Sequence, residues 1–394
     1  MIYLDNNATT PVAPEVLEAM LPFLRDEYAN PSSGYEFARP SKAALARARG
    51  EVADLLGAEA EEIVFTGCGT ESINAAIFSA VRLRPEKPLV LVSTVEHGAS
   101  WKSAEAAAGM ENVIRLGVGR DGLYDLAQLR EILDTQAPRL ALASLMWANN
   151  ETGVLPGIRE AADLLAAAGV PLHCDAVQAA GKVPVDVRSL PVDFLSISGH
   201  KFHAPKGVGA LFVRRGADFH PLLNGGSHEG GRRAGTENVA FAAALGCAAS
   251  LARAKLASGA MGKVAALRDR FEERLLAEVP EAHRNGHREW RTPNTSNLRF
   301  DGAPSSVTLV VLDEQGLCCS SGSACKANSG KASHVLTAMG LSDHEARSSL
   351  RLSFSTWTTE TEADQAAEIV ARAVARVRAA QVPPPGSRVV RRKS

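Results

Sequence analysis

The sequence has few cysteines, almost no net charge and no long uninterrupted apolar run, and each absence excludes a class of protein. Six cysteines in 394 residues are too few for a disulfide scaffold, and no two of them have the Cys-x-x-Cys spacing that favours zinc. A net charge of −1 gives no global field that would attract nucleic acid or an anionic membrane. No run reaches the roughly 18 to 20 apolar residues that span a bilayer. We therefore expect reduced thiols, no structural metal, and no nucleic-acid or membrane partner.

The remaining composition is that of a soluble globular protein, with 45% hydrophobic and 22% charged residues. A chain of 394 residues is too long for one small core and predicts two or three domains. The first residues lack the basic and apolar regions of a signal peptide, so we expect a cytoplasmic protein. Residues 381–394, rich in proline and arginine, predict a disordered basic tail.

Short apolar runs alternate with helical patterns over the first part of the chain. The runs typical of buried strands are 63–66, 89–93, 140–146, 170–173 and 194–197. The stretches with helical spacing are 41–56, 125–133 and 158–168. Such alternation predicts parallel strands joined by crossover helices, with ligands bound at the carboxyl ends of the strands.

The pattern changes beyond residue 250, where alanine, leucine and arginine predict one long helix over residues 251–276. Strands at 296–300 and 349–354 follow, and a last helix is expected over 361–380. We place a domain boundary near residue 255. A large domain then covers residues 15–255, and a smaller domain combines residues 1–14 with 256–380.

Polar segments follow several of the predicted strands, where a site should lie. Residues 67–71 carry two glycines that would let the backbone and a helix N-terminus approach an anion, although a plain strand-to-helix turn has the same sequence. His97 follows the strand at 89–93, and it is either structural or catalytic. The run 149–153 reads Asn-Asn-Glu-Thr-Gly, which also suits a turn.

Asp175 and Lys201 end two neighbouring strands. A buried aspartate is costly without a cationic partner, and a protonated pyridinium nitrogen would be such a partner; a helix N-cap is the alternative role. A lysine at the mouth of the sheet can form a Schiff base with a cofactor aldehyde, with Ser198 and His200 placed to hold a phosphate. His200-x-x-His203 lacks a third metal ligand at a fitting spacing, so we predict no metal site.

Residues 320–330 form a segment of small and polar residues around Cys325. A cysteine that packs in a core belongs in an apolar run, whereas a nucleophilic thiolate needs exposure and a nearby positive charge, which Lys326 supplies. This composition favours a reactive thiol.

In this order, the segments resemble the NifS/IscS family of cysteine desulfurases, which belongs to the class V aminotransferase superfamily of pyridoxal-phosphate (PLP) fold type I. The resemblance covers residues 4–359. It rests on Gly-Thr-Glu, Glu-His, Asn-Asn-Glu-Thr-Gly, Asp-Ala-Val-Gln, Ser-Gly-His-Lys, Arg-Ala-Gly-Thr-Glu-Asn and Ser-Ser-Gly-Ser-Ala-Cys. It implies an α/β fold: a large domain with a mostly parallel mixed sheet flanked by helices, and a smaller α+β domain that carries the cysteine segment.

The resemblance also implies how PLP would be held. Lys201 would bind the cofactor aldehyde, and Asp175 would pair with the pyridinium nitrogen. His97 would stack on the ring and assist proton transfers, and Gln178 would hydrogen-bond the phenolic oxygen. The phosphate would be held by Gly69, Thr70, Ser198 and His200.

Further roles concern the substrate, the acceptor and a second subunit. Asn150 and Arg351 would hold the carboxylate of L-cysteine, since the arginine fork binds carboxylates in a bidentate manner. Cys325 would take the sulfur as a persulfide and leave alanine. Thr236 would reach the phosphate of a neighbouring subunit, which implies a homodimer. The sulfur would pass to an iron–sulfur scaffold or another acceptor protein.

Alternative functions on the same fold are a selenocysteine lyase and a PLP aminotransferase, and Cys325 in its serine-glycine segment favours sulfur transfer over both. A non-catalytic scaffold is the alternative from another class, and the joint presence of Lys201, Asp175, His97 and Cys325 argues against it. The pair Cys318-Cys319 could relay a persulfide or pack as small hydrophobic side chains.

Overall fold

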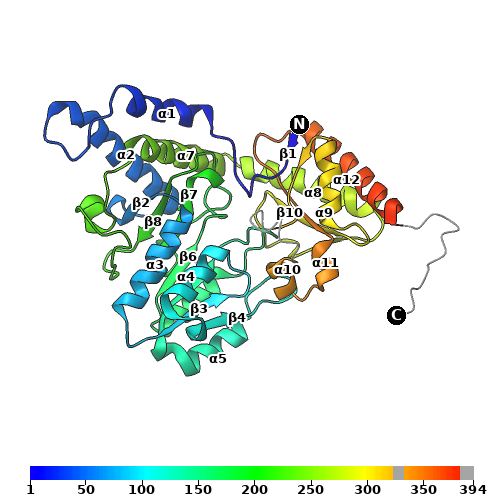
Figure 1. The fold of residues 1–394 in the computed structure, drawn as a ribbon, viewed down its shortest axis with the longest axis horizontal. Helices are drawn as coiled ribbons and strands as arrows, with labels where there is room; N and C mark the ends of the chain where they lie inside the picture. Colours follow the sequence, from blue (N-terminus) through cyan, green and yellow to red (C-terminus); the bar gives the residue numbers. More distant parts are fainter. Residues whose placement is uncertain (323–331, 382–394) are drawn as a thin grey trace, which may run out of the picture.

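The computed structural model describes residues 1–322 and 332–381. These residues form a large α/β part and a smaller α+β part (Figure 1), which confirms the predicted fold class. The main apolar core of the large part draws on residues 13–252, and that of the smaller part on Ile2, Leu4 and residues 264–377. Cys325 and the predicted basic tail lie outside the described residues.

A seven-stranded sheet forms the centre of the large part. Its strand order is β2-β8-β7-β6-β5-β3-β4, and all neighbours are parallel except the pairs that involve β8. In this order the strands are Ile63–Thr66, Gly209–Val213, Phe194–Ser198, Leu172–Asp175, Leu140–Met146, Leu89–Ser93 and Val113–Leu116. Six of them are almost wholly buried, which explains their continuous apolar sequences, because helices cover both faces of such a sheet.

All five predicted strands of this part are present, and one is displaced. β6 begins at Leu172 rather than Val170 and continues to Asp175. Pro171 has no N–H to give to a ladder, and the Val170 N–H instead bonds the Leu165 carbonyl at 3.0 Å. Because β6 ends later than predicted, Asp175 is its last residue and lies at the carboxyl end of the strand. The strands β4 and β8 were not predicted.

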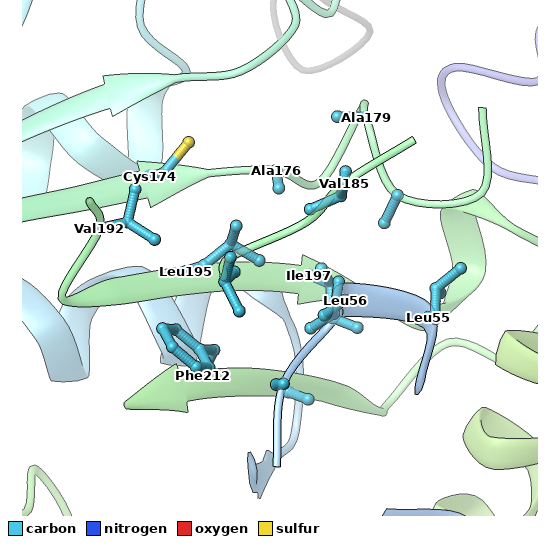
Figure 2. Close-up of a cluster of buried hydrophobic side chains, with 14 of the residues drawn as sticks. Leu55, Leu56, Cys174, Ala176, Ala179, Val185, Val192, Leu195, Ile197 and Phe212 are labelled. Carbon is cyan, nitrogen blue, oxygen red and sulfur yellow. The ribbon is translucent and has the colours of Figure 1, made fainter. Parts of the chain in front are cut away.

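Seven helices surround the sheet. They are α1 Pro14–Arg25, α2 Arg39–Leu56, α3 Gly69–Leu83, α4 Gly98–Ala108, α5 Leu126–Gln136, α6 Ile158–Ala167 and α7 Val239–Ala257. The predicted helices at 41–56, 125–133 and 158–168 correspond to α2, α5 and α6. α2 ends where Gly57 adopts a left-handed conformation, with φ of 67°. Figure 2 shows part of the core, where apolar side chains from α2, β6, β7 and β8 gather.

The helix α7 is long and apolar enough to cross a membrane by length and composition, so the expectation that no such stretch exists is wrong. However, 56% of its apolar window is buried inside the fold. It packs against α1 and α2, which lie together with it in Figure 1. Its apolar sequence therefore serves the protein core.

The single helix predicted over residues 251–276 is also wrong. α7 ends at Ala257, and a separate helix α8 covers Ala260–Glu278. Gly259 lies between them with φ of 73°, a left-handed conformation that glycine adopts readily. The glycine was the signal in the sequence that should have ended the helix.

The smaller part combines both ends of the described chain. β10 Thr295–Phe300 pairs antiparallel with β9 Ala282–Arg284 and β12 Ser349–Ser353. β1 Ile2–Tyr3 pairs in parallel with β11 Leu317–Cys318. The helices of this part are α8, α9 Ser305–Glu314, α10 His334–Ala338, α11 Asp343–Arg347 and α12 Glu360–Gln381. The strands predicted at 296–300 and 349–354 and the last helix are thereby confirmed.

His173 on β6 is a buried polar residue that makes the fold sensitive to acid. Its ring bonds the hydroxyls of Ser144 on β5 and Ser196 on β7, both at 2.8 Å. Burial lowers the pKa of His173 to about 3, whereas an unfolded histidine titrates near pH 6.5. The unfolded chain therefore binds a proton below pH 6.5 that the folded protein does not, and stability falls as the pH drops from 6.5 toward 3.

We expect His173 to contribute a loss of about 2 to 3 kcal/mol in unfolding free energy between pH 6.5 and 4.5. His173→Gln keeps hydrogen-bonding atoms near both serines but does not titrate, so it should be less stable at pH 7.5 and yet lose less stability on acidification. Urea unfolding at pH 7.5, 6.5, 5.5 and 4.5 measures the slope of unfolding free energy against pH for the unmodified protein and for His173→Gln. Equal slopes for the two proteins would contradict the assignment.

Candidate active site

A cavity of about 270 Å³ lies at the carboxyl ends of β5, β6 and β7, beside the start of α3. It brings together ten of the residues predicted for the site. These are Gly69, Thr70, His97, Asn150, Asp175, Gln178, Ser198, His200, Lys201 and Arg351. Residues far apart in the chain thus meet where a parallel sheet binds ligands.

The start of α3 gives the cavity an anion-binding wall. Gly69 is the first residue of the helix, and its N-cap residue Cys68 makes no side-chain hydrogen bond to the helix N-terminus. A Cβ atom on Gly69 would lie 2.8 Å from a methyl carbon of Val177 and 3.1 Å from Cβ of Ser198. Glycine therefore lets the helix N-terminus approach β7 closely, and its first N–H groups are left to an anionic ligand.

Asp175 supplies the carboxylate of the site. It is 5% exposed, and its Oδ1 accepts the Val177 N–H at 2.9 Å. Burial raises the pKa of Asp175, while the Val177 N–H and the nearby His97 and Lys201 act in the opposite direction. Within residues 1–322 and 332–381, no lysine or arginine forms an ion pair with this carboxylate. A cationic ligand group in the cavity would supply that partner.

His97 faces the same cavity from the N-cap of α4. Its Nδ1 accepts the Ala99 N–H at 3.1 Å, so the proton of the neutral ring is on Nε2. Burial lowers the pKa of His97, and the charges of Lys201 and His334 lower it further against the opposing effect of Asp175. The ring is therefore neutral at neutral pH and can donate or pass one proton through Nε2.

Lys201 lies directly after β7 in a short 3-10 turn, Gly199–Lys201. Its Nζ donates to the backbone oxygens of Asn7 and Ala8 at 2.7 and 2.8 Å. The adjacent His200 ring bonds Thr9 Oγ1 at 3.1 Å. Burial and the charges of Lys201 and Lys206 lower the pKa of His200 to about 4, so it acts as a neutral hydrogen-bonding group at neutral pH.

Arg351 enters the cavity from β12 of the smaller part. Its Nη2 donates to Asp5 Oδ1 at 2.7 Å and its Nη1 to the Asn150 carbonyl at 3.0 Å. The guanidinium is almost fully buried, and in the described part of the chain its Nε has no hydrogen-bond partner. A buried donor without a partner favours a ligand with an acceptor such as a carboxylate.

Asn7 is a site residue that sequence reasoning missed. Its backbone N–H donates to Ser353 Oγ at 2.9 Å, and its Nδ2 donates to Thr295 Oγ1 at 2.9 Å. Its carbonyl also accepts from Gln178 Nε2 at 3.0 Å, besides Lys201. Asn7 therefore connects the smaller part to the cavity. The polar run after Leu4 was the available signal, since a strand end followed by asparagines marks a site candidate as well as a turn.

Two predicted residues are not among those that line the cavity. Thr236 is exposed and outside it, although its neighbours Gly235 and Glu237 line an adjacent hollow. Cys325 lies outside the described residues. The described residues on either side of the gap meet at Glu151, which follows the cavity residue Asn150: a Cβ on Gly322 would lie 2.7 Å from Glu151 Oε2, and Ser333 Oγ donates to the same oxygen.

The pair Cys318-Cys319 is half-buried beside the smaller core. Burial raises the pKa of both thiols, and the Asp5 carboxylate raises them further. Raised thiol pKa values disfavour the thiolate that a sulfur relay would need. The geometry therefore supports a packing role for this pair.

Comparison with known proteins places the chain in a family. The class-V aminotransferase family matches residues 2–366. A cysteine desulfurase 2 of Trichormus variabilis is 47% identical over 380 residues, which cover 96% of this chain and 94% of the relative. The cysteine desulfurase NifS of Azotobacter vinelandii is 44% identical, with coverage of 96% and 93%.

A solved structure of a NifS-like protein superposes with a TM-score of 0.87 at 31% identity, and the match covers 95% of this chain and 99% of that one. Both the family match and the relatives extend over nearly the whole described chain, so they include the cavity and the smaller part. The chain belongs to the class-V aminotransferase family, among its NifS-like cysteine desulfurases.

Proposed function

We propose that the protein takes sulfur from L-cysteine with PLP held at Lys201, leaving L-alanine and a persulfide on Cys325. The observation that carries the proposal is the buried Asp175 carboxylate, which shares one cavity with Lys201 and a helix N-terminus. A cationic ring nitrogen, an aldehyde and a phosphate are the three groups that such a cavity accommodates together.

The residues of the cavity fit this cofactor group by group. Asp175 would pair with the pyridinium nitrogen, Gln178 would donate to the phenolic oxygen, and His97 would cover the ring. The N–H groups at the start of α3, with Ser198 and His200, would hold the phosphate. The N–H groups are those of Gly69 and Thr70, and all four residues line the cavity. When bound, PLP supplies an electron sink for charge that develops at the substrate carbon.

The protein's own groups would then carry out binding, proton transfer and sulfur transfer. Arg351 and Asn150 would bind the substrate carboxylate, and Lys201 Nζ would move the proton from the substrate Cα. The Cys325 thiolate would attack the substrate sulfur, so that a sulfur–sulfur bond forms as the carbon–sulfur bond breaks. The electron pair of the broken bond passes to the substrate Cβ, which takes a proton, and the product leaves as alanine. His97 Nε2 would exchange one proton in this sequence.

The quaternary and cellular context is part of the proposal. A homodimer would let the exposed Thr236 reach the phosphate held by a second copy. The domain boundary near residue 255 would separate the two apolar cores, with residues 1–14 joined to the smaller one. An iron–sulfur scaffold or another thio-cofactor enzyme would accept the sulfur in the cytoplasm.

Replacing Cys325 tests the sulfur-transfer step. With L-cysteine and a reductant, Cys325→Ser should keep the visible absorbance of bound PLP. Its rate of alanine and sulfide release should fall at least about 1,000-fold, because the nucleophile that accepts the sulfur is missing. Cys318→Ser is the matched control, and it should stay within about threefold of the unmodified enzyme, since surface or packing thiols contribute little. Equal sulfide release by Cys325→Ser would favour a lyase that eliminates sulfide directly.

Replacing Gly69 tests the phosphate wall. Gly69→Ala places a methyl group against Val177 and Ser198, so the start of α3 must shift from its position beside β7, and its N–H groups shift from the phosphate position with it. We expect roughly 10- to 100-fold weaker PLP binding, which corresponds to about 1 to 3 kcal/mol. Gly98→Ala is the control at the first position of α4, where an added Cβ meets nothing within 4 Å. Absorbance titration of apoprotein with PLP measures both affinities. Unchanged affinity in Gly69→Ala would remove this wall from the site.

A further inference from the structure

Lys182 is a buried lysine that the reaction scheme does not use. It is 6% exposed and follows Gly181, which adopts a left-handed conformation with φ of 75°. Its Nζ donates to Gln178 Oε1 and to Asn7 Oδ1, the latter at 3.1 Å. Gln178 lines the cavity and Lys182 does not; Lys182 instead lines a second hollow that also contacts Lys201.

The two partners of Gln178 leave its amide only one orientation. The Lys182 ammonium has donors and no acceptor, so the amide oxygen must face it. The Asn7 carbonyl is an acceptor only, and it takes one Nε2 hydrogen at 3.0 Å. The second Nε2 hydrogen then remains for a ligand acceptor. A flipped amide would place two donors together at Lys182 and two acceptors together at Asn7.

The surroundings of Lys182 make a purely electrostatic stabilising role a poor explanation. Among the described residues no carboxylate forms an ion pair with it. Burial lowers its pKa, and the charges of Lys201 and Arg351 lower it further. A buried cation without a carboxylate costs stability, and methionine of similar length would be easier to bury. The position therefore calls for a reason other than folding.

We propose that Lys182 is a positioning residue that holds the Gln178 carboxamide with its nitrogen toward the cavity and so fixes the hydrogen bond that Gln178 donates to the cofactor's phenolic oxygen. The inference rests on the proposed binding of PLP at Lys201. Loss of this donor would leave more negative charge on the phenolic oxygen. That charge would favour the protonated form of the nitrogen through which Lys201 holds the cofactor.

The pH dependence of the visible absorbance of bound PLP reads out that proton directly. Lys182→Met should raise the midpoint by about one pH unit, a tenfold change in proton affinity, through loss of the oriented donor and of a nearby charge. When Gln178→Leu is already present, Lys182→Met should add less than about half of that shift, because only the through-space charge effect remains. Lys255→Met is the control, since Lys255 does not line the cavity and its ammonium lies 5.7 Å from the Trp357 ring centroid, and it should leave the midpoint unchanged.

Additive shifts in the two backgrounds would overturn the inference, because Lys182 would then act independently of Gln178. Gln178→Glu gives a second test if Lys182→Met does not fold, since the new carboxylate can pair with Lys182 in the same network. It should raise the midpoint by at least one pH unit, and an unchanged midpoint would also overturn the inference. A lack of the cofactor band in the unmodified protein would instead overturn the proposed function itself.

Discussion

The hydrogen bonds of Asn7 are the constraint on which the site depends. This one buried residue bonds Ser353 and Thr295 of the smaller part through donors, and Lys201, Gln178 and Lys182 of the large part through acceptors. Asn294 Nδ2 also donates to its Oδ1 at 3.0 Å. The two parts have separate apolar cores. The hydrogen bonds of Asn7 therefore fix the position of Arg351 in the smaller part relative to Lys201 in the large part. A buried amide with all its groups bonded specifies geometry more strictly than apolar contact does.

Burial sets the protonation of the groups around the cavity. Desolvation and the charge of Lys201 keep His97 and His200 neutral. Burial raises the pKa of Asp175, while the Val177 N–H and the charge of Lys201 act in the opposite direction. Glu96 precedes His97 and is fully buried, with its carboxylate bonded to Ser93 of β3 and Met146 of β5, and burial raises its pKa to about 8. The site therefore combines two neutral imidazoles with the Asp175 carboxylate, which would be stabilised by a cationic ligand group. This combination suits a cofactor with a basic ring nitrogen.

Strand-end polar residues were the part of the site that could be predicted from the sequence. Asp175, Lys201 and His97 follow apolar runs, and a parallel sheet brings such ends to one edge, so their proximity in one cavity followed from the pattern. Asn7 carries the same signal after β1 and was overlooked, whereas Lys182 lies in a turn beyond β6 and is not a strand-end residue. The contacts of Asn7, including the one with Lys182, join residues more than 100 positions apart, which local spacing does not encode, although Gln178, the other partner of Lys182, is four residues away from it.

The fold errors have equally local causes. The prediction of one helix over 251–276 was wrong because the helix propensity of its alanines was given more weight than the break at Gly259. The predicted start of β6 was too early because Pro171 has no N–H to donate to a strand ladder. β8 was missed because it returns antiparallel to β7 without a crossover helix, so the alternation used to find the other strands does not apply to it.

The most direct test of the account is mass spectrometry of the protein after brief incubation with L-cysteine without reductant. We expect the peptide with Cys325 to gain one sulfur atom while alanine is released in equal amount. Alanine and sulfide release with an unmodified Cys325 peptide, or with the added sulfur on another cysteine, would contradict it.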